Sequence, residues 1–185
     1  MISKEKVYII AEAGVNHNGD LNLALKLIEE AKKSGADCVK FQTFKAEQIV
    51  TKTSPKAKYQ LKVTDSMETQ FDMLKKLELK SNYYKPILNL CKKLNIDFLS
   101  TPVSFSDVDF LDDLDVFGFK IASAQLVELP FLEYVALKNK VIVLSTGMAN
   151  LSDVYNAVSH IRKFGNNKIY VLQCTTNYPS SIEDA

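Results

Sequence analysis

Hydrophobic positions follow two patterns along the chain: short continuous apolar runs, and longer stretches with apolar residues three or four positions apart. The first pattern is typical of strands buried on both faces of a parallel sheet, and the second of amphipathic helices. Six apolar runs predict strands at Val7–Ala11, Ala36–Thr43, Ile96–Pro102, Phe117–Ser123, Val141–Met148 and Ile169–Thr176. The spacing between them predicts helices at Leu21–Ala31, Glu68–Leu77, Ser81–Leu94, Val108–Leu114, Leu129–Leu137 and Leu151–Phe164.

Strict alternation of strand and helix predicts a parallel sheet with right-handed crossovers. Two closures compete, an open doubly wound sheet and an eight-stranded barrel. Polar residues lie at the ends of all six predicted strands: Glu12, Lys40 and Gln42, Thr101, Lys120 and Ser123, Ser145 and Thr146, Thr175 and Thr176. An open sheet uses the ends of a few strands for its ligand, whereas contributions from every strand are typical of a barrel. We therefore predict an α/β fold of the (β/α)8 TIM-barrel type.

Chain length limits how much of such a barrel is present. The chain has 185 residues and six predicted strands, whereas a complete barrel of this type has roughly 250 residues. We expect residues 1–185 to form one partial barrel domain of about six β-α units, with the last two units missing.

Local signals predict where two of the helices begin. Asp20 is placed to cap the first helix, whose apolar face includes Leu25 and Ile28. Ser152 or Asp153 is expected to cap the last helix.

Composition is that of an ordinary globular domain, with 46% hydrophobic and 24% charged residues. The formal net charge of +1 includes no basic excess in either half, so nucleic acid is not expected as a partner. The first apolar run is too short for a signal peptide or a membrane span, so no membrane association is expected. Cys38, Cys91 and Cys174 lack metal-type spacing, which predicts buried, reduced thiols in a cytoplasmic protein.

The connection from Phe44 to Asn82 is unusually long for a β-α loop, and long connections in compact domains are commonly functional. Two hypotheses remain open for it, a solvated basic cover and a lid over the strand ends. It carries five lysines before its short helix: Lys45, Lys52, Lys56, Lys58 and Lys62.

Lys40 and Lys120 end two different predicted strands and could face one point. With the hydroxyl groups of Ser123, Ser145 and Thr101 they would suit a phosphate or carboxylate, because these anions need positive partners and hydrogen-bond donors. A structural ion pair with a carboxylate is the alternative, since a buried lysine needs a partner. A third possibility is a Schiff base on one lysine.

Glu12 could act as a general base or bind a sugar hydroxyl, or it could be the countercharge of Lys40 or Lys120. His17 lies in a polar turn, where histidines more often anchor loops than bind metals. His160 is expected to face the surface of a helix. No histidine pair has ligand spacing, so a metal would need ligands from outside this chain. Neither a Ser-His-Asp order, a P-loop nor a glycine-rich dinucleotide motif is present.

Six ordered motifs carry a family resemblance. They are Ile10-Ala-Glu-Ala-Gly-Val-Asn-His-Asn-Gly-Asp20, Val39-Lys-Phe-Gln-Thr43, Ser100-Thr-Pro102, Lys120-Ile-Ala-Ser123, Leu144-Ser-Thr-Gly-Met148 and Cys174-Thr-Thr-Asn-Tyr-Pro179. Together the motifs resemble the sialic acid synthase family, which includes N-acetylneuraminate, legionaminate and pseudaminate synthases.

The resemblance implies a transferase that condenses phosphoenolpyruvate with an N-acetylmannosamine-type amino sugar. The products would be a nonulosonic (sialic-type) acid and phosphate. It implies three catalytic residues: Glu12, Lys40 and Lys120. It implies a phosphoenolpyruvate site made of Lys40, Thr101, Lys120, Ser123, Ser145 and Thr176. It implies a sugar site made of Gln42, Tyr178, Asn16 and His17.

The resemblance also implies parts that this chain lacks. A divalent Mn or Mg ion would have its ligands beyond residue 185, as would a small C-terminal antifreeze-like domain. The full-length protein would be a cytoplasmic homodimer, and this chain alone is expected to be inactive.

Three positions depart from the family pattern. Val103 stands where the family has Phe, Gln125 where it has Glu, and Gln173 where it has His. Two alternatives stay open: a Schiff-base pyruvate aldolase that uses Lys40 or Lys120, and a non-catalytic module that binds phosphoenolpyruvate or sugar, which the missing barrel units and Gln125 make plausible. The long connection and the residue sequence of Thr175–Pro179 favour a bacterial diacetamido-trideoxy sugar as the acceptor.

Overall fold

The computed structural model describes residues 6–56 and 68–184. The chain forms two compact units, Met1–Val103 and Ser104–Ala185, and each is taken by itself. Two residues named above, Lys58 and Lys62, lie outside the described residues.

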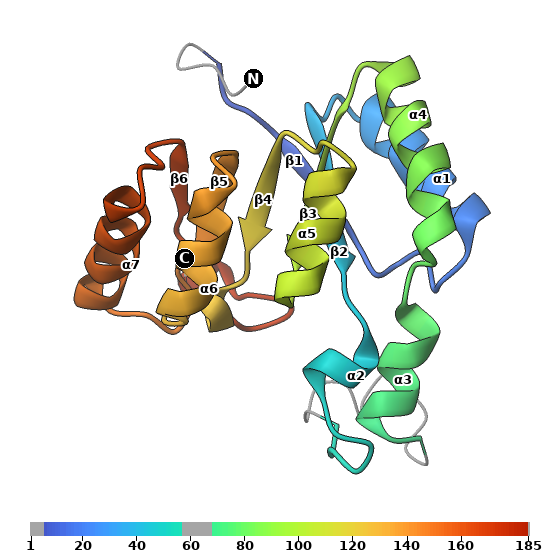
Figure 1. The fold of residues 1–185 in the computed structure, drawn as a ribbon. Coiled ribbons are helices and arrows are strands. Elements are labelled where there is room, and N and C mark those ends of the chain that lie inside the picture. Colours follow the sequence, from blue (N-terminus) through green and yellow to red (C-terminus); the bar gives the residue numbers. More distant parts are fainter. Residues whose placement is uncertain (1–5, 57–67, 185) are drawn as a thin grey trace. The chain divides into compact units, whose positions relative to one another are not determined.

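The first unit contains a parallel sheet in the order β1 (Ile10–Gly14), β2 (Cys38–Thr43) and β3 (Asp97–Pro102). Glu12 lies opposite Lys40 in the register of β1 with β2, and Gln42 lies opposite Thr101 in that of β2 with β3. Helices α1 (Leu21–Lys33) and α4 (Tyr84–Leu94) pack side by side (Figure 1). The parallel pairing is the one predicted from the alternating pattern.

Capping explains where α1 begins. The Asp20 side chain accepts a hydrogen bond from the backbone N–H of Leu23, as predicted. The helix buries Ala24, Ile28 and Ala31. Ile28 lies on the expected face, whereas Leu25 is only partly buried.

The first strand is present as predicted, but its predicted limits are wrong. Val7 is 80% exposed and Ile9 is 53% exposed, and the strand begins at Ile10. The register explains the shift, because the register partner of Ile10 is Cys38, the first residue of β2. Residues before Ile10 therefore have no β2 residue opposite them, and Glu12 lies within β1 rather than at its end.

The described residues of the long connection include three short elements: α2 (Ala46–Ile49), α3 (Gln70–Leu77) and η2 (Ser81–Tyr83). The predicted short helix is confirmed as α3. Thr69 and Asp72 form a capping box at its start, and Met73 is its buried residue.

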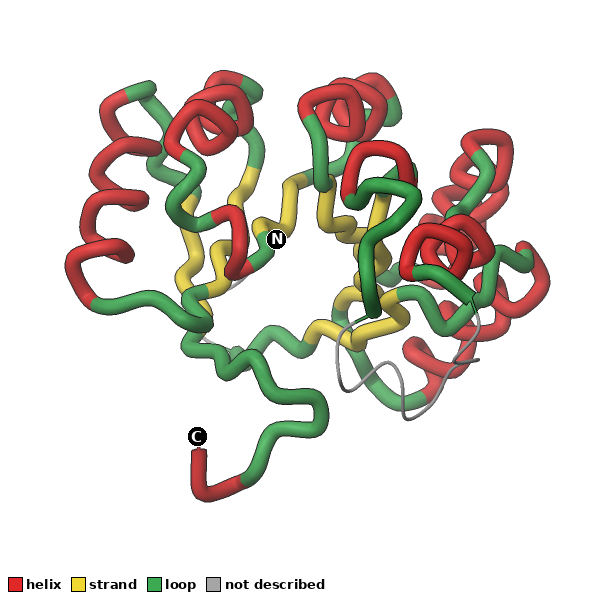
Figure 2. Tube along the Cα trace, turned by 90° about the horizontal axis from the view of Figure 1, so that it is seen from below, coloured by secondary structure: helices red, strands yellow, loops and turns green. Residues whose placement is uncertain are grey.

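The second unit contains a parallel sheet in the order β4 (Gly118–Ile121), β5 (Val141–Ser145) and β6 (Ile169–Leu172). Its helices are α5 (Phe105–Asp113), α6 (Leu129–Leu137) and α7 (Leu151–Lys163), with the short turns η3 (Ser123–Gln125) and η4 (Ile182–Asp184). In both units the helices lie along one side of the strands (Figure 2).

Two details of the second unit differ from the predictions. The three strands end earlier than expected, so Ser123, Thr146 and Thr176 lie in the segments that follow them. The cap of α7 is Asn150, because its side-chain oxygen accepts from the backbone N–H groups of Ser152 and Asp153.

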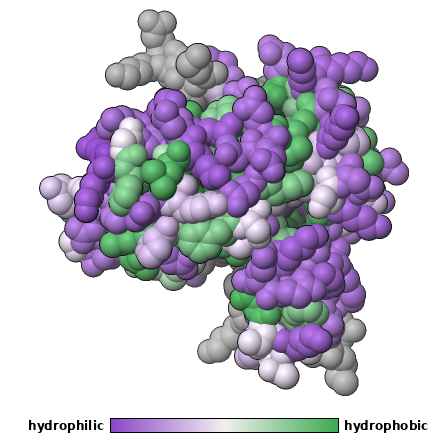
Figure 3. Space-filling model, viewed as in Figure 1, coloured by the Kyte–Doolittle hydropathy of each residue, from purple (hydrophilic) through white to green (hydrophobic). Residues whose placement is uncertain are grey.

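Surface character differs between the helices. Hydrophilic side chains cover most of the face of α1 and α4 in Figure 3, whereas apolar side chains are exposed on α6 and α7. They include Leu137, Leu151 and Tyr155. Across the described part of the chain, no helix is both long and apolar enough to cross a bilayer.

Candidate active site

An ion pair joins two of the predicted catalytic residues in the first unit. Lys40 Nζ contacts Glu12 Oε2 across the register pair of β1 and β2. The lysine side chain is 12% exposed and the carboxylate side chain 51% exposed. The countercharge role suggested for Glu12 is therefore confirmed for Lys40, and about half of the Glu12 side chain stays exposed to solvent.

Gly14 makes room for this carboxylate. Its φ is +53°, and a Cβ atom there would lie 3.0 Å from Glu12 Oε1. Glycine meets both demands, because it adopts a positive φ without strain and leaves the carboxylate its space.

Two more predicted residues share the face of Lys40. Gln42 is two positions further along β2, and Thr101 is its register partner on β3, so all three side chains point to one side of the sheet. The opposite face holds Thr43, whose Oγ1 lies 2.6 Å from Ser100 Oγ and accepts from Tyr84 Oη at 2.9 Å. That second face is structural packing against α4.

His17 is fully buried in the turn after β1. Its Nδ1 accepts from the backbone N–H of Gly19 at 3.0 Å, so the neutral ring carries its proton on Nε2. The ring stacks on Phe41 with centroids 5.9 Å apart, and Nε2 has no partner among the described residues. Burial lowers the pKa of His17. The turn-anchor role is thus observed, while Asn16 beside it is exposed.

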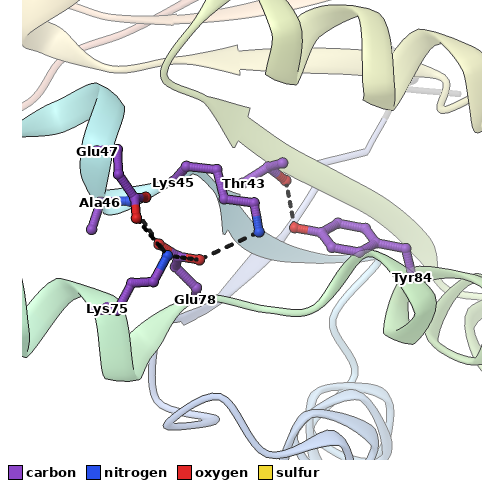
Figure 4. A network of polar contacts seen from close by, with 7 residues as sticks. All are labelled: Thr43, Lys45, Ala46, Glu47, Lys75, Glu78 and Tyr84. Atoms are coloured by element: carbon purple, nitrogen blue, oxygen red, sulfur yellow. Dashed lines mark hydrogen bonds and ion pairs between the residues drawn. The ribbon is translucent and has the colours of Figure 1, made fainter.

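Two glutamates, Glu47 and Glu78, join separate parts of the long connection through ion pairs and a hydrogen bond (Figure 4). Glu78, whose side chain is 10% exposed, accepts from the backbone N–H of Ala46 at 2.7 Å and pairs with Lys45 and Lys75 at 3.3 and 3.1 Å. Lys75 also pairs with Glu47 at 2.8 Å. Glu78 therefore supplies, from a distant segment, the cap that α2 lacks locally.

The burial of Lys56 contradicts the hypothesis that this part of the connection is a solvated cover. Its side chain is 1% exposed and pairs with Glu68 at 3.0 Å. The lid hypothesis for this segment stays a prediction.

A second polar group forms in the second unit around Lys120. This lysine is buried in β4, donates to the carbonyl oxygen of Ile121 at 2.9 Å and contacts Ser145 Oγ at the end of β5. Cys174 Sγ lies 3.3 Å from the same Ser145 oxygen. Thr146 donates its hydroxyl to the carbonyl oxygen of Leu172 at 2.8 Å.

Gly147 joins two further predicted residues to this group. Its backbone N–H donates to Ser123 Oγ at 3.0 Å. A Cβ atom on Gly147 would lie 2.7 Å from Thr176 Cγ2 and 2.9 Å from Ser123 Oγ, so Ser123 and Thr176 meet across it. We call these residues the lysine–serine cluster: Lys120, Ser123, Ser145, Gly147, Cys174 and Thr176.

The cluster can bind an anion. It combines a buried ammonium group with serine hydroxyl groups in one small region, and both donate strongly to phosphate or carboxylate oxygens. The sequence indicated four of its members. It missed Gly147 and Cys174, since neither residue type marks an anion site without tertiary contacts.

The remaining predicted residues are placed as follows. Tyr178 is 73% exposed in the segment after β6. Cys38 and Cys91 are buried and Cys174 partly so, and all three are free thiols. Burial raises the pKa of the Cys38 thiol to about 12 and that of Cys91 to about 12.

Because each unit is described by itself, the convergence of Lys40 and Lys120 on one pocket stays a prediction.

The described residues form no candidate metal site. The described residues hold no set of three or more His, Cys, Asp and Glu side chains placed for a metal ion. His160 is partly buried on α7 with its ring 5.0 Å from that of Phe164, rather than at the surface as expected. The expected divalent ion is therefore not fitted by the residues present.

Parallel β-α units define an α/β protein of the barrel type, and comparison with known proteins gives its family. The sequence model of the NeuB family matches residues 27–185. The chain belongs to the NeuB family.

Relatives and a solved structure agree with this assignment. The N,N'-diacetyllegionaminic acid synthase of Campylobacter jejuni subsp. jejuni is 50% identical over 97% of this chain, and that of Legionella pneumophila subsp. pneumophila is 44% identical over 96%. The N-acetylneuraminic acid synthetase of Leptospira borgpetersenii, solved with citrate, superposes with a TM-score of 0.83 at 31% identity over 97% of this chain. The predicted fold class and the family resemblance are confirmed.

The chain spans about half the length of the relatives it matches. It covers 54% and 51% of the two synthases and 57% of the solved protein chain.

Proposed function

We propose that this chain is part of a synthase that condenses phosphoenolpyruvate with an N-acetylmannosamine-type amino sugar. The products are a nonulosonic acid and phosphate. The observation that carries the proposal is the lysine–serine cluster, an anion-binding arrangement in a chain of the NeuB family.

The phosphoenolpyruvate site is assigned to residues of both units. Lys120 supplies positive charge, and the hydroxyl groups of Ser123, Ser145 and Thr176 supply hydrogen-bond donors. Lys40 and Thr101, which share one face of the first sheet, complete the set. Phosphate and carboxylate both need such partners, and donors fixed in advance stabilise the charge that develops during reaction.

Glu12 is assigned to the reacting carbons. Its ion pair with Lys40 keeps the carboxylate in place, and its exposed half leaves an oxygen for the substrate. It serves as a base or stabilises positive charge on the phosphate-bearing carbon. The sugar is assigned to Gln42, Tyr178 and Asn16, with the buried His17 ordering the turn that carries Asn16.

The reaction forms one carbon–carbon bond. The enol carbon of phosphoenolpyruvate attacks the aldehyde carbon of the open-chain sugar, water adds to the phosphate-bearing carbon, and cleavage of its C–O bond releases phosphate. Mn or Mg is expected from the family resemblance. The described residues do not supply a ligand set for it.

The acceptor is assigned to the 2,4-diacetamido-trideoxy hexoses. Two relatives that match nearly the whole chain are named N,N'-diacetyllegionaminic acid synthases, which supports this choice over a 2-acetamido hexose. The complete protein is proposed to act in the cytoplasm as a homodimer.

Product analysis tests the proposal. The complete protein that contains this chain is incubated with phosphoenolpyruvate, Mn and a panel of 2-acetamido and 2,4-diacetamido hexoses, and products are identified by mass spectrometry. A nonulosonic acid from a diacetamido sugar is expected. Borohydride trapping with pyruvate should leave both lysines unlabelled, and a labelled lysine would favour the aldolase instead. Phosphoenolpyruvate binding without turnover would favour the non-catalytic module.

A further inference from the structure

Cys174 has no role in the reaction proposed above, yet it lies against the lysine–serine cluster. Its sulfur is 3.3 Å from Ser145 Oγ and 3.5 Å from the carbonyl oxygen of Leu172. The thiol is partly buried in the segment after β6. Its position makes it a direct neighbour of Ser145, one of the residues proposed to bind phosphoenolpyruvate.

The hydrogen-bond inventory of Ser145 explains why this neighbour matters. A serine hydroxyl has one hydrogen to donate and two lone pairs that accept. A lysine ammonium group can only donate, so Ser145 Oγ accepts from Lys120. The hydroxyl hydrogen of Ser145 therefore points away from Lys120. Among the described residues, Ser145 Oγ has one further contact, with the sulfur of Cys174.

The thiol can be arranged in two ways, and both leave this hydrogen available. If the S–H group points at Ser145 Oγ, both lone pairs of the serine are filled and its hydrogen has no acceptor there. If the S–H group points at Leu172, which already accepts from Thr146 at 2.8 Å, the serine hydrogen rests on sulfur. Sulfur is a weak acceptor, so the serine hydroxyl can change its hydrogen bond from sulfur to an anionic oxygen at little cost.

We propose that Cys174 is a positioning residue for Ser145: its thiol, a weak donor and a weak acceptor, holds the serine oxygen toward Lys120 and leaves the hydroxyl hydrogen for the bound anion. The inference rests on the proposed phosphoenolpyruvate site. It adds a reason for sulfur at this position, since a hydroxyl oxygen there would be a strong acceptor and would hold the hydrogen that the ligand needs.

Two substitutions separate this role from simple packing. Cys174→Ser preserves size and adds a strong acceptor, whereas Cys174→Ala removes the acceptor and leaves a small void. Competition by the new hydroxyl should weaken phosphoenolpyruvate binding about fivefold in Cys174→Ser, and Cys174→Ala should change it by less than about twofold. A packing role predicts the reverse order.

The test is a double-mutant cycle on the complete protein, with phosphoenolpyruvate as the probe in calorimetric titrations. In a Ser145→Ala background, changing Cys174 to Ser should no longer weaken binding, because the hydrogen in competition is gone. If Cys174→Ser binds as tightly as Cys174→Ala, or weakens binding equally without Ser145, the inference is overturned while the proposed function stands. If the wild-type protein does not bind phosphoenolpyruvate, the proposed function itself fails.

A second measurement does not depend on whether the variants fold. The infrared S–H stretching band of a thiol responds to its hydrogen bonding, and the buried thiols of Cys38 and Cys91 provide internal references. Phosphoenolpyruvate should shift the S–H band of Cys174 and leave those of Cys38 and Cys91 in place. An unchanged Cys174 band in the saturated protein would overturn the assigned role of Cys174.

Discussion

A methyl group at position 147 would close the space between Ser123 and Thr176 without removing either side chain. The added Cβ atom would lie 2.7 Å from Thr176 Cγ2 and 2.9 Å from Ser123 Oγ, where ordinary contact begins at 3.4 Å. Both side chains must therefore retreat by about 0.5–0.7 Å. Gly147 is not among the residues with positive φ, so alanine adds no backbone strain there.

The magnitude follows from what the retreat displaces. Overpacking costs about 1–3 kcal/mol, and the lower end applies here because both obstructing groups are side chains. Moving the Ser123 hydroxyl away from an anion loses a hydrogen bond to a charged group, about 1.5–3 kcal/mol. Gly147→Ala should therefore bind phosphoenolpyruvate about 10- to 100-fold more weakly, while Tm falls by only a few degrees.

The assay pairs calorimetric titration of phosphoenolpyruvate with thermal melting of the complete protein. Gly165→Ala is the matched control, because Gly165 lies in the same unit with φ +86° and nothing within 4 Å of an added Cβ atom. It strains the backbone without crowding the cluster, so it should lower Tm and leave affinity unchanged. Wild-type affinity in Gly147→Ala, or an equal loss in Gly165→Ala, would refute the reasoning.

Three further predictions concern stability. Burial lowers the pKa of His17 below the value of about 6.5 expected in the unfolded chain, so the unfolded state binds the proton more readily and stability should fall as pH drops below about 6.5. Urea titrations across that range should show this dependence reduced in His17→Gln and kept in His160→Gln; equal slopes in both would contradict it. Gly118→Ala should lower the unfolding free energy by about 3 kcal/mol, since its Cβ atom would lie 2.5 Å from the backbone oxygen of Val141, and an unchanged melting curve would count against this packing. Glu78→Gln keeps an acceptor for α2 but loses two ion pairs, so its Tm should be lower than wild type by a margin that shrinks in high salt; a salt-independent difference would exclude that cause.

Helices with local signals were predictable from the sequence. The cap at Asp20 and the apolar spacing place α1, and α6 has the predicted bounds Leu129–Leu137. Both signals lie within a few residues of the element they define. Such information does not depend on the rest of the fold.

The position of β1 was not predictable in the same way. The apolar run Val7–Ala11 predicted the strand too early, because strand limits follow the register with β2. Pairing partners lie far apart in sequence, and hydrophobicity alone does not fix which residues they are.

The candidate site divides along the same line. Polar residues at strand ends indicated Lys120, Ser123, Ser145 and Thr176, since parallel strands bring their carboxyl ends to one edge. The sulfur of Cys174 beside Ser145 is a contact between residues 29 positions apart, which no local pattern records. The neutral tautomer of His17 likewise follows from its buried contact with Gly19.

The account depends most on one arrangement, with Glu12, Lys40 and Lys120 around a single phosphoenolpyruvate molecule. A crystal structure of the complete protein with phosphoenolpyruvate tests it directly. We expect both ammonium groups within hydrogen-bond distance of the ligand's phosphate or carboxylate oxygens and the Glu12 carboxylate beside its reacting carbons. A ligand bound away from Lys120, or the two lysines on separate pockets, would contradict the account.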